Sequence, residues 1–209
     1  MLKSALQTIT VLFSLLITSC TLPEVTVTIT DNEPLKSMYE KDLEIRELNA
    51  KEDTIRLEDY DKIHREKVFE LLSRGLVITP LDKLRASWIL QHTNITSCEG
   101  ELRSISPENY LLAYHLIISA IKDTANYHQK IPVRMAALNY DRYLLYTKGY
   151  QKYGTQRVFD DEGNEFIAPI DTILATDEER MKYNVESLLE LKKKYRLKPL
   201  EQKLTPSLN

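Results

Sequence analysis

Proline and glycine divide most of this chain into segments of helical length. Thr79-Pro80 and Ser106-Pro107 each place a capping side chain before a proline, an arrangement that favours the first turn of a helix. Gly75 and Gly149 stand where two apolar periodic segments end, and glycine readily terminates a helix. The chain contains only 5 glycines, so few tight turns between strands are expected. The pattern predicts a mainly α fold.

The predicted architecture is one helical domain of about six helices with a small β-hairpin before the last helix. Helices are expected at residues 37–50, 54–74, 80–92, 107–123, 132–147 and 176–195. The hairpin is expected where short runs at 156–159 and 165–168 flank a turn that contains Gly163. Thr176 and Glu179 have the spacing of a capping box at the start of the last helix.

The first twenty residues predict an export signal with a lipid attachment site. The apolar run from Ala5 to Ile17 has 13 residues, whereas a bilayer-spanning helix needs ~20. The run ends in Ile17-Thr18-Ser19-Cys20, which resembles the bacterial lipobox. The resemblance implies that Cys20 is acylated, by palmitate among other chains, and anchors the mature protein in a membrane. The alternative is an ordinary cleaved signal peptide whose last residues include a cysteine.

Four parts of the chain follow from this interpretation. They are the lipoprotein signal peptide (1–19), the acylated cysteine with its tether (20–36), the helical domain (37–200) and a disordered tail (201–209). Thr21 rather than aspartate follows Cys20, which under the usual sorting rule favours the outer membrane of the cell envelope. The net charge of −3 provides no basic field for nucleic acid. The expected partners are the membrane, through Cys20, and an envelope protein or a small polar ligand.

One carboxylate is expected inside the core. At about 100° per residue, the apolar stripe of helix 132–147 contains Ala137, Leu138, Leu144 and Leu145, and Asp141 lies at its centre. A buried carboxylate is costly unless it is hydrogen-bonded or paired. Asp141 is therefore either an internal anchor for a nearby loop or a catalytic carboxylate.

The loop at residues 149–156 and His92 are the candidate partners of Asp141. The loop contains two glycines, two glutamines and a threonine, which suit it to hold a carboxylate or a polar ligand. His92 is expected on the inward face of its helix, either as a satisfied core residue or as a general acid or base. The sequence has no metal-ligand spacing, Walker loop or nucleophile elbow, so no metal or other cofactor is predicted.

These residues resemble a bacterial family of small domains of unknown function. The family carries Gln-His, Asp-Arg and Gln-x-Tyr-Gly-Thr-Gln in that order, and the resemblance covers residues 55–195. This chain departs from the family in a long insertion from Ile95 to Ser106. The resemblance implies a shared site and no particular reaction. The matching residues are Gln91, His92, Asp141, Arg142, Gln151, Tyr153, Gly154, Thr155 and Gln156.

We expect a lipid-anchored envelope protein that binds a partner or a small polar ligand without catalysis, because no complete catalytic constellation is present. The ligand would contact Gln91, Gln151, Tyr153, Gly154, Thr155 and Gln156. The alternative is a small envelope enzyme in which Asp141 orients a catalytic His92, and Arg142 with Gln156 binds an anionic or carbonyl-bearing substrate. A third possibility is that Asp141 and Arg142 only hold the loop.

Overall fold

The computed structural model describes residues 29–52, 57–98, 101–123, 131–160 and 162–199. In this part of the chain it has a mainly α fold in one domain, as predicted. The helices are α1 (Glu33–Glu52), α2 (Leu57–Ser73), α3 (Pro80–Leu90), α4 (Glu108–Asp123), α5 (Arg134–Lys148), α6 (Asp177–Lys182) and α7 (Leu188–Lys194). The strands are β1 (Ile95–Cys98), β2 (Glu101–Ser104), β3 (Arg157–Phe159), β4 (Glu165–Ile167) and β5 (Arg196–Leu197).

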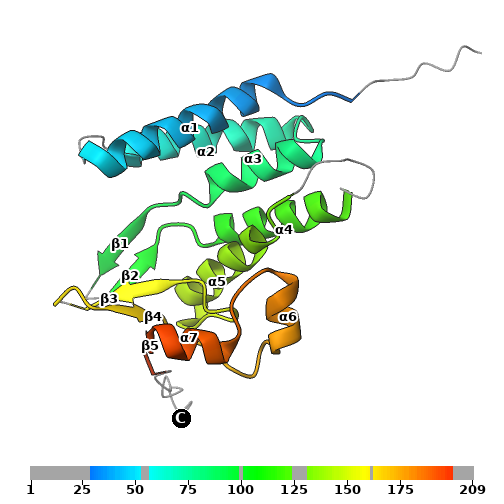
Figure 1. Ribbon diagram of the computed structural model, residues 1–209. Coiled ribbons are helices and arrows are strands. Elements are labelled where there is room, and N and C mark those ends of the chain that lie inside the picture. Colours follow the sequence, from blue (N-terminus) through cyan, green and yellow to red (C-terminus); the bar gives the residue numbers. More distant parts are fainter. Residues whose placement is uncertain (1–28, 53–56, 99–100, 124–130, 161, 200–209) are drawn as a thin grey trace, which may run out of the picture.

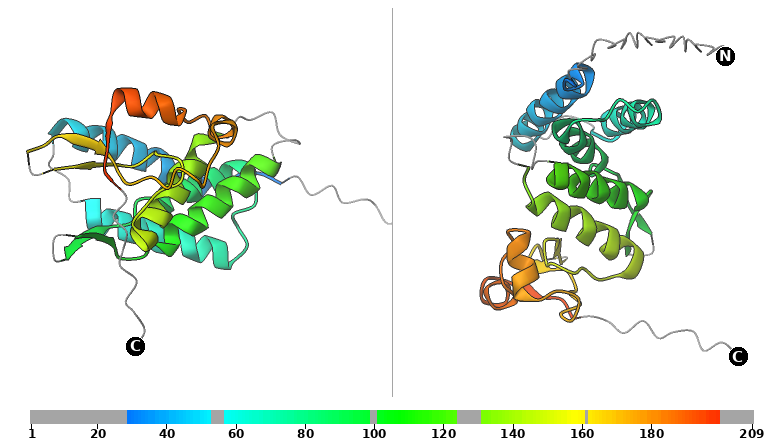
Figure 2. Two further views of the ribbon diagram at one scale, coloured as in Figure 1. Left: turned by 90° about the horizontal axis from the view of Figure 1, so that it is seen from below. Right: turned by 90° about the vertical axis from the view of Figure 1, so that its right-hand side faces the viewer.

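The helices form a stack that follows the chain order (Figure 1). α1 and α2 lie at one end and pack on α3, which packs on α4, and α4 packs on α5. The elements that follow α5 form the opposite end of the stack, as the right-hand view of Figure 2 shows. α5 is therefore placed between the helical layers and the C-terminal elements, so one side of α5 faces α4 and the other faces the C-terminal elements.

The apolar core continues through these layers. Leu35, Val68, Ile89 and Ala113 represent its first part, where α1 to α4 meet. A second part joins α4 to α5, and the two smallest clusters bury the C-terminal elements against α5 and against one another. The predicted inward faces of the helices therefore form a nearly continuous apolar interior.

α1 begins at Glu33, within the segment predicted to be a tether. The Asn32 side chain accepts the Leu35 N–H at 2.9 Å and so caps the first turn. Pro34 lies in that turn, where its missing N–H is not needed. The prediction of a start at Ser37 was wrong because this cap was overlooked. The signal peptide, Cys20, most of the tether and the 201–209 tail lie outside the described residues.

The four central helices agree with the prediction within a few residues. Thr79 caps α3, and its side chain and that of Asp82 form a reciprocal capping box. Gly75 and Gly149 have φ angles of +66° and +79° and end α2 and α5 as expected. The predicted start of α2 at Thr54 lies outside the described residues.

The predicted last helix is two short helices. Thr176 caps α6 by accepting the Glu179 N–H, but the Glu179 carboxylate accepts from Lys152 and Tyr153 and does not complete the predicted capping box. The chain then turns at Asn184, whose φ is +53°. The Val185 N–H then bonds the Arg180 carbonyl, which is a left-handed helix ending. Ser187 starts α7 with its own capping box. The single long helix was therefore wrong, because asparagine can replace glycine at such an ending.

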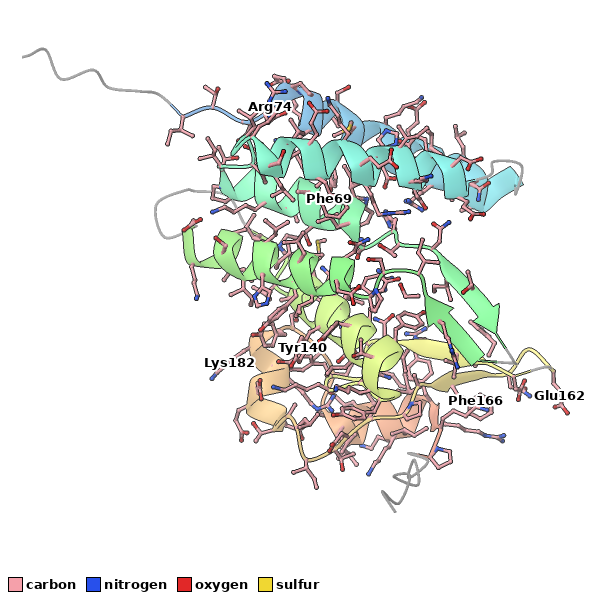
Figure 3. The ribbon with its side chains drawn as sticks, turned by 180° about the vertical axis from the view of Figure 1, so that it is seen from behind. Phe69, Arg74, Tyr140, Glu162, Phe166 and Lys182 are labelled. Carbon is pink, nitrogen blue, oxygen red and sulfur yellow. The ribbon has the colours of Figure 1, made fainter. Side chains whose placement is uncertain are left out.

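Two small sheets complete the fold. The predicted hairpin is confirmed as β3 and β4, and β5 pairs with β4 in parallel, which was not predicted. The insertion from Ile95 to Ser106 forms a second, unpredicted hairpin of β1 and β2. Figure 3 shows Glu162 and Phe166 on the β3–β4 hairpin, at the end of the molecule opposite to Arg74.

Candidate functional site

Asp141 points into the interior, and its carboxylate is saturated by the loop that follows α5. The residue is 0% exposed. Oδ1 accepts the backbone N–H groups of Lys152 and Tyr153, each at 2.8 Å. Oδ2 accepts the Thr155 N–H at 2.9 Å and the Thr155 hydroxyl at 2.8 Å. These donors fill the four lone-pair positions of the carboxylate, so none remains for a substrate.

The environment of Asp141 has opposing effects on its protonation. Burial raises the pKa of the Asp141 carboxyl, and the hydrogen bonds from Tyr153, Thr155 and Lys152 oppose that rise. All of these donors belong to one short segment of the chain. The carboxylate thus determines the path of the loop.

Gln151 and Arg180 hold the same loop from other sides. The Gln151 amide donates to the carbonyls of Gln156 and Ala168 at 2.9 and 2.8 Å and accepts the Gln156 N–H at 2.8 Å. Arg180, which is fully buried on α6, donates to the backbone carbonyls of Lys152 and Tyr153. Several donors and acceptors of the loop backbone therefore have their partners within the protein.

Gly154 allows the loop to pack tightly against α7. Its φ is +77°, a conformation that side-chain-bearing residues rarely adopt. A Cβ at this position would lie 2.6 Å from Leu191 Cδ1 and 2.9 Å from Ile170 Cδ1. The Tyr-Gly-Thr-Gln segment is thus a packed interior element, and this geometry favours a structural role for Asp141.

Arg142 connects this loop to the end of α3. Its Nε donates to Gln156 Oε1 at 3.2 Å, and its Nη1 donates to Gln91 Oε1 at 3.1 Å and to the Gln91 carbonyl at 3.4 Å. Burial lowers the pKa of the Arg142 guanidinium, Tyr110 and Tyr146 oppose this effect, and Arg46 adds to it. All of these hydrogen-bond partners are neutral amide oxygens. One guanidinium therefore joins the three sequence motifs.

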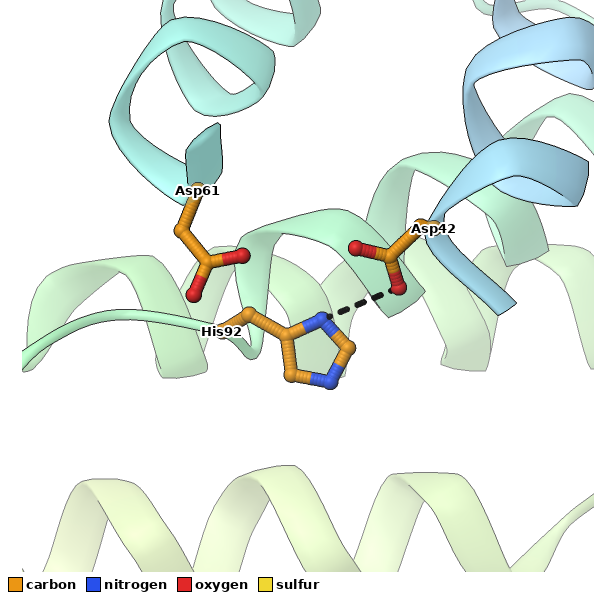
Figure 4. Close-up of side chains that lie close together, drawn as sticks. All are labelled: Asp42, Asp61 and His92. Carbon is orange, nitrogen blue, oxygen red and sulfur yellow. Dashed lines mark ion pairs between the residues drawn. The ribbon is translucent and has the colours of Figure 1, made fainter. Parts of the chain in front are cut away.

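His92 follows α3 and faces Asp42, which comes from α1 (Figure 4). Its Nδ1 lies 3.5 Å from Asp42 Oδ2 and is buried without a hydrogen bond. The side chain as a whole is 16% exposed, and its second ring nitrogen points away from both carboxylates in Figure 4. The carboxylate beside His92 is thus Asp42, whereas the enzyme hypothesis assigned that position to Asp141, whose oxygens are occupied by the loop.

Arg46 joins Asp42 to a second carboxylate. Its Nε and Nη2 donate to Asp42 at 2.9 and 3.0 Å, and Nη2 also contacts Asp61 of α2. The Trp88 indole donates to Asp42 Oδ2 at 2.7 Å. Asp42 and Asp61 are both buried. The contacts of Arg46 with Asp61 and of Trp88 with Asp42 link α1 to α2 and α3. This is a compact ion-pair network in which the geometry of Asp42 is fixed.

The surroundings keep His92 neutral. Burial lowers the pKa of His92 to about 2, and the positive charges of Arg46, Arg142 and Arg65 contribute to the shift. Arg65 also donates to the backbone carbonyl of His92. Because efficient general acids and bases have pKa values near the working pH, this imidazole is suited to hydrogen bonding rather than to proton transfer.

Asp42, Asp61 and His92 are also the described residues with the geometry nearest to a metal site. Their ligand atoms lie within 4.8 Å of one another. Arg46 already bridges the two carboxylates, however, and occupies the position of a cation between them. A metal ion would have to displace this guanidinium.

Sequence reasoning missed Asp42, Arg46, Asp61 and Arg65. A signal for Asp42 was present, because Leu35 and Met38 precede it at helical spacing and both pack in the core. The same projection that identified Asp141 would have placed Asp42 on the buried face of α1. The high charge of this helix obscured the inward carboxylate.

The predicted site residues occupy two connected networks. The loop network consists of Asp141, Gln151, Tyr153, Gly154, Thr155 and Gln156. Arg142 connects this network, through Gln156, to Gln91 and the neighbouring His92. The loop network is internal, and the half-buried side chains of His92 and Arg142 lie nearer to solvent. The structure thus brings the motif residues together, but the hydrogen bonds of Asp141 to described residues all come from the loop and none from His92.

Comparison with family models, curated proteins and solved structures found no match for this chain. Within the described residues, no helix has both the length and the apolar character needed to cross a membrane. The predicted acylation site, Cys20, lies outside those residues.

Proposed function

We propose that this chain is a lipid-anchored protein of the bacterial envelope whose helical domain binds a small polar ligand without catalysing a reaction. The binding site comprises the side chains of Gln91, His92 and Arg142, which we call the Arg142–His92 site. The lipobox-like ending at Cys20 supports the anchor. The resemblance of the motif residues to a domain family supports a shared site.

One observation carries the proposal: Arg142 is half-buried yet has no carboxylate partner among the described residues. Its hydrogen bonds all go to the amide oxygens of Gln91 and Gln156. A buried guanidinium is normally paired with an anion, because an isolated charge is costly in the interior. A ligand that completes its coordination is a physical reason for such an arrangement.

A catalytic role for the same residues has one observation in its favour. The Asp42 carboxylate stands behind His92, as an orienting carboxylate does in acid–base dyads. The low pKa of His92 opposes this role, because the imidazole is too weakly basic to accept a proton efficiently near neutral pH. Asp141 offers no free oxygen. Ligand binding therefore accounts better for both residues.

The anchor and the binding function can be tested in one preparation. The full chain is produced in a bacterium, extracted from membranes with detergent and analysed by mass spectrometry, intact and after denaturation. We expect acyl chains on Cys20 and a small molecule that is released on denaturation. Cys20→Ser should move the protein to the soluble fraction, whereas Cys98→Ser, the matched control, should leave it in the membrane.

The two halves of the proposal fail separately. An unmodified Cys20 in the membrane fraction would overturn the anchor. A preparation that contains no small molecule, and that binds none from a fractionated envelope extract, would overturn the binding function.

A further inference from the structure

We propose that the ligand of the Arg142–His92 site is a small organic acid that carries a hydroxyl group next to its carboxylate. This inference rests on the proposed function and specifies the chemistry of its ligand. It is based on the charges around His92 and on the hydrogen-bonding capacity that His92 and Arg142 retain.

The arginines near His92 are not all paired with acids. Arg46, Arg65 and Arg142 are close enough for their positive charges to act on the imidazole. Arg46 pairs with Asp42 and Asp61, whereas no carboxylate is among the groups that act on Arg142. A monoanion bound beside Arg142 would compensate its charge, which is favourable in a partly buried location.

The uncompensated charge is located at Arg142. Arg46 pairs with both Asp42 and Asp61, and the charges of Asp61 and Glu66 act on Arg65. The charged and titratable groups that act on Arg142 are instead Tyr110, Tyr146 and Arg46. Tyr110 on α4 and Tyr146 on α5 are neutral at physiological pH, because burial raises the pKa of both phenols. The anion is therefore expected beside Arg142.

Arg142 retains donors that suit a carboxylate. Its Nε and Nη1 are used for Gln156 and Gln91, whereas its Nη2 has no hydrogen bond to the residues that the structure describes. A guanidinium nitrogen of this kind offers two hydrogens in a fixed plane. Charge-assisted bonds from it to a carboxylate are stronger than those to neutral oxygens.

His92 specifies the second group of the ligand. Its Nδ1 faces the Asp42 carboxylate, and this negative neighbour favours the tautomer with the proton on Nδ1. The other ring nitrogen, which points away from both acids in Figure 4, then carries a lone pair. It requires a donor such as a hydroxyl. Arg142 Nη1 binds Gln91, the residue before His92, so a ligand with a donor next to its carboxylate can serve both side chains.

Three small probes of nearly equal size test this assignment. Lactate has both groups, propionate lacks the hydroxyl, and lactamide lacks the charge. Trp88 is the only tryptophan of the chain, and the centroid of its ring lies 5.4 Å from that of the His92 ring. Tryptophan fluorescence therefore reports on the site. The full chain in detergent micelles is titrated with each probe. We expect saturable binding of lactate, about tenfold weaker binding of propionate because one hydrogen bond is lost, and no measurable binding of lactamide.

Two variants and one control locate the effect. Arg142→Gln should abolish lactate binding, and Arg157→Gln, at an exposed arginine paired with Glu165, is the matched control that should retain it. His92→Phe should remove the preference for lactate over propionate. If Arg142→Gln does not fold, the ranking of the probes on the natural chain still decides the question.

The outcomes separate this inference from the proposed function. Equal binding of lactate and propionate, binding of lactamide, or no binding of any probe would overturn the ligand class assigned here. If the purified protein then still carries a small molecule of another class, the proposed function stands. If it carries and binds none, both fail.

Discussion

Thr155 binds the same oxygen of Asp141 twice, with its backbone N–H at 2.9 Å and its hydroxyl at 2.8 Å. Both bonds come from a residue 14 positions later in the chain, across the turn that contains Gly154. The pair fixes the end of the loop relative to α5. It explains why a carboxylate lies at the centre of an apolar helix face.

Replacement of this carboxylate should be costly. In Asp141→Asn one oxygen becomes an NH2 group, which faces donors of the loop and cannot accept their hydrogen bonds. We expect a loss of about 2–4 kcal/mol in the free energy of unfolding, measured by urea denaturation. Asp59→Asn changes an exposed acid on α2 and should remain within about 0.5 kcal/mol of the natural protein. Equal effects of the two substitutions would mean that the network does not stabilise the fold.

Two glycines allow strain and crowding to be measured separately. Gly154 and Gly163 have similar φ angles, +77° and +82°, but only Gly154 has neighbours where a Cβ would lie. Both alanine variants should lose about 1–2 kcal/mol through backbone strain. Gly154→Ala should lose a further 1–3 kcal/mol, roughly, through overpacking against Leu191 and Ile170. The difference in thermal unfolding between the two variants tests whether this close approach exists in solution.

His92 should make the protein sensitive to mild acid. Its pKa is about 2 in the folded protein and near 6.5 in the unfolded chain, so the unfolded state takes up a proton first as the pH falls. Stability should therefore decrease below pH 6.5, by about 2 kcal/mol at pH 5 relative to a chain without this group. Urea denaturation of the natural protein and of His92→Gln at pH 7 and pH 5 measures this difference. An NMR titration of His92 with a midpoint near 6.5 would contradict the burial described here.

Arg46 should exclude divalent cations from the Asp42–Asp61–His92 cluster. We expect Zn²⁺ to leave the melting temperature of the natural protein unchanged, because the guanidinium already binds both acids and occupies the position of a cation between them. In Arg46→Ala the carboxylates lose this partner, and Zn²⁺ should raise the melting temperature of that variant. The double variant Arg46→Ala/His92→Phe should lose the response. A shift with the natural protein would show that Arg46 is displaced readily.

The sequence predicted features that depend on neighbouring residues. Capping by Thr79 and termination at Gly149 follow from local chemistry, and α3 and α5 were placed accordingly. The break at Asn184 was missed because asparagine enters the left-handed region less often than glycine. The pairing of β5 with β4 joins segments about 30 residues apart, and no local pattern indicates it.

The candidate site shows the same limit. Helical periodicity identified the inward direction of Asp141, and the loop composition identified its partners. Periodicity could not show which carboxylate meets His92, because Asp42 lies 50 positions earlier on another helix. Asp42 and Asp141 are buried to a similar extent but have different hydrogen-bond and ion-pair partners. Their roles therefore follow from the packing of the helices rather than from either segment alone.

The parallel pairing of β4 with β5 has a consequence for synthesis of the chain. Arg196 and Leu197 leave the ribosome after every other described element, and Leu191, which packs beside Gly154, leaves only shortly before them. The helical layers from α1 to α4 can associate while translation continues, whereas the Tyr-Gly-Thr-Gln segment must await the synthesis of α7. A premature stop before α7 would therefore yield a product with its first helices assembled and its polar loop unsupported.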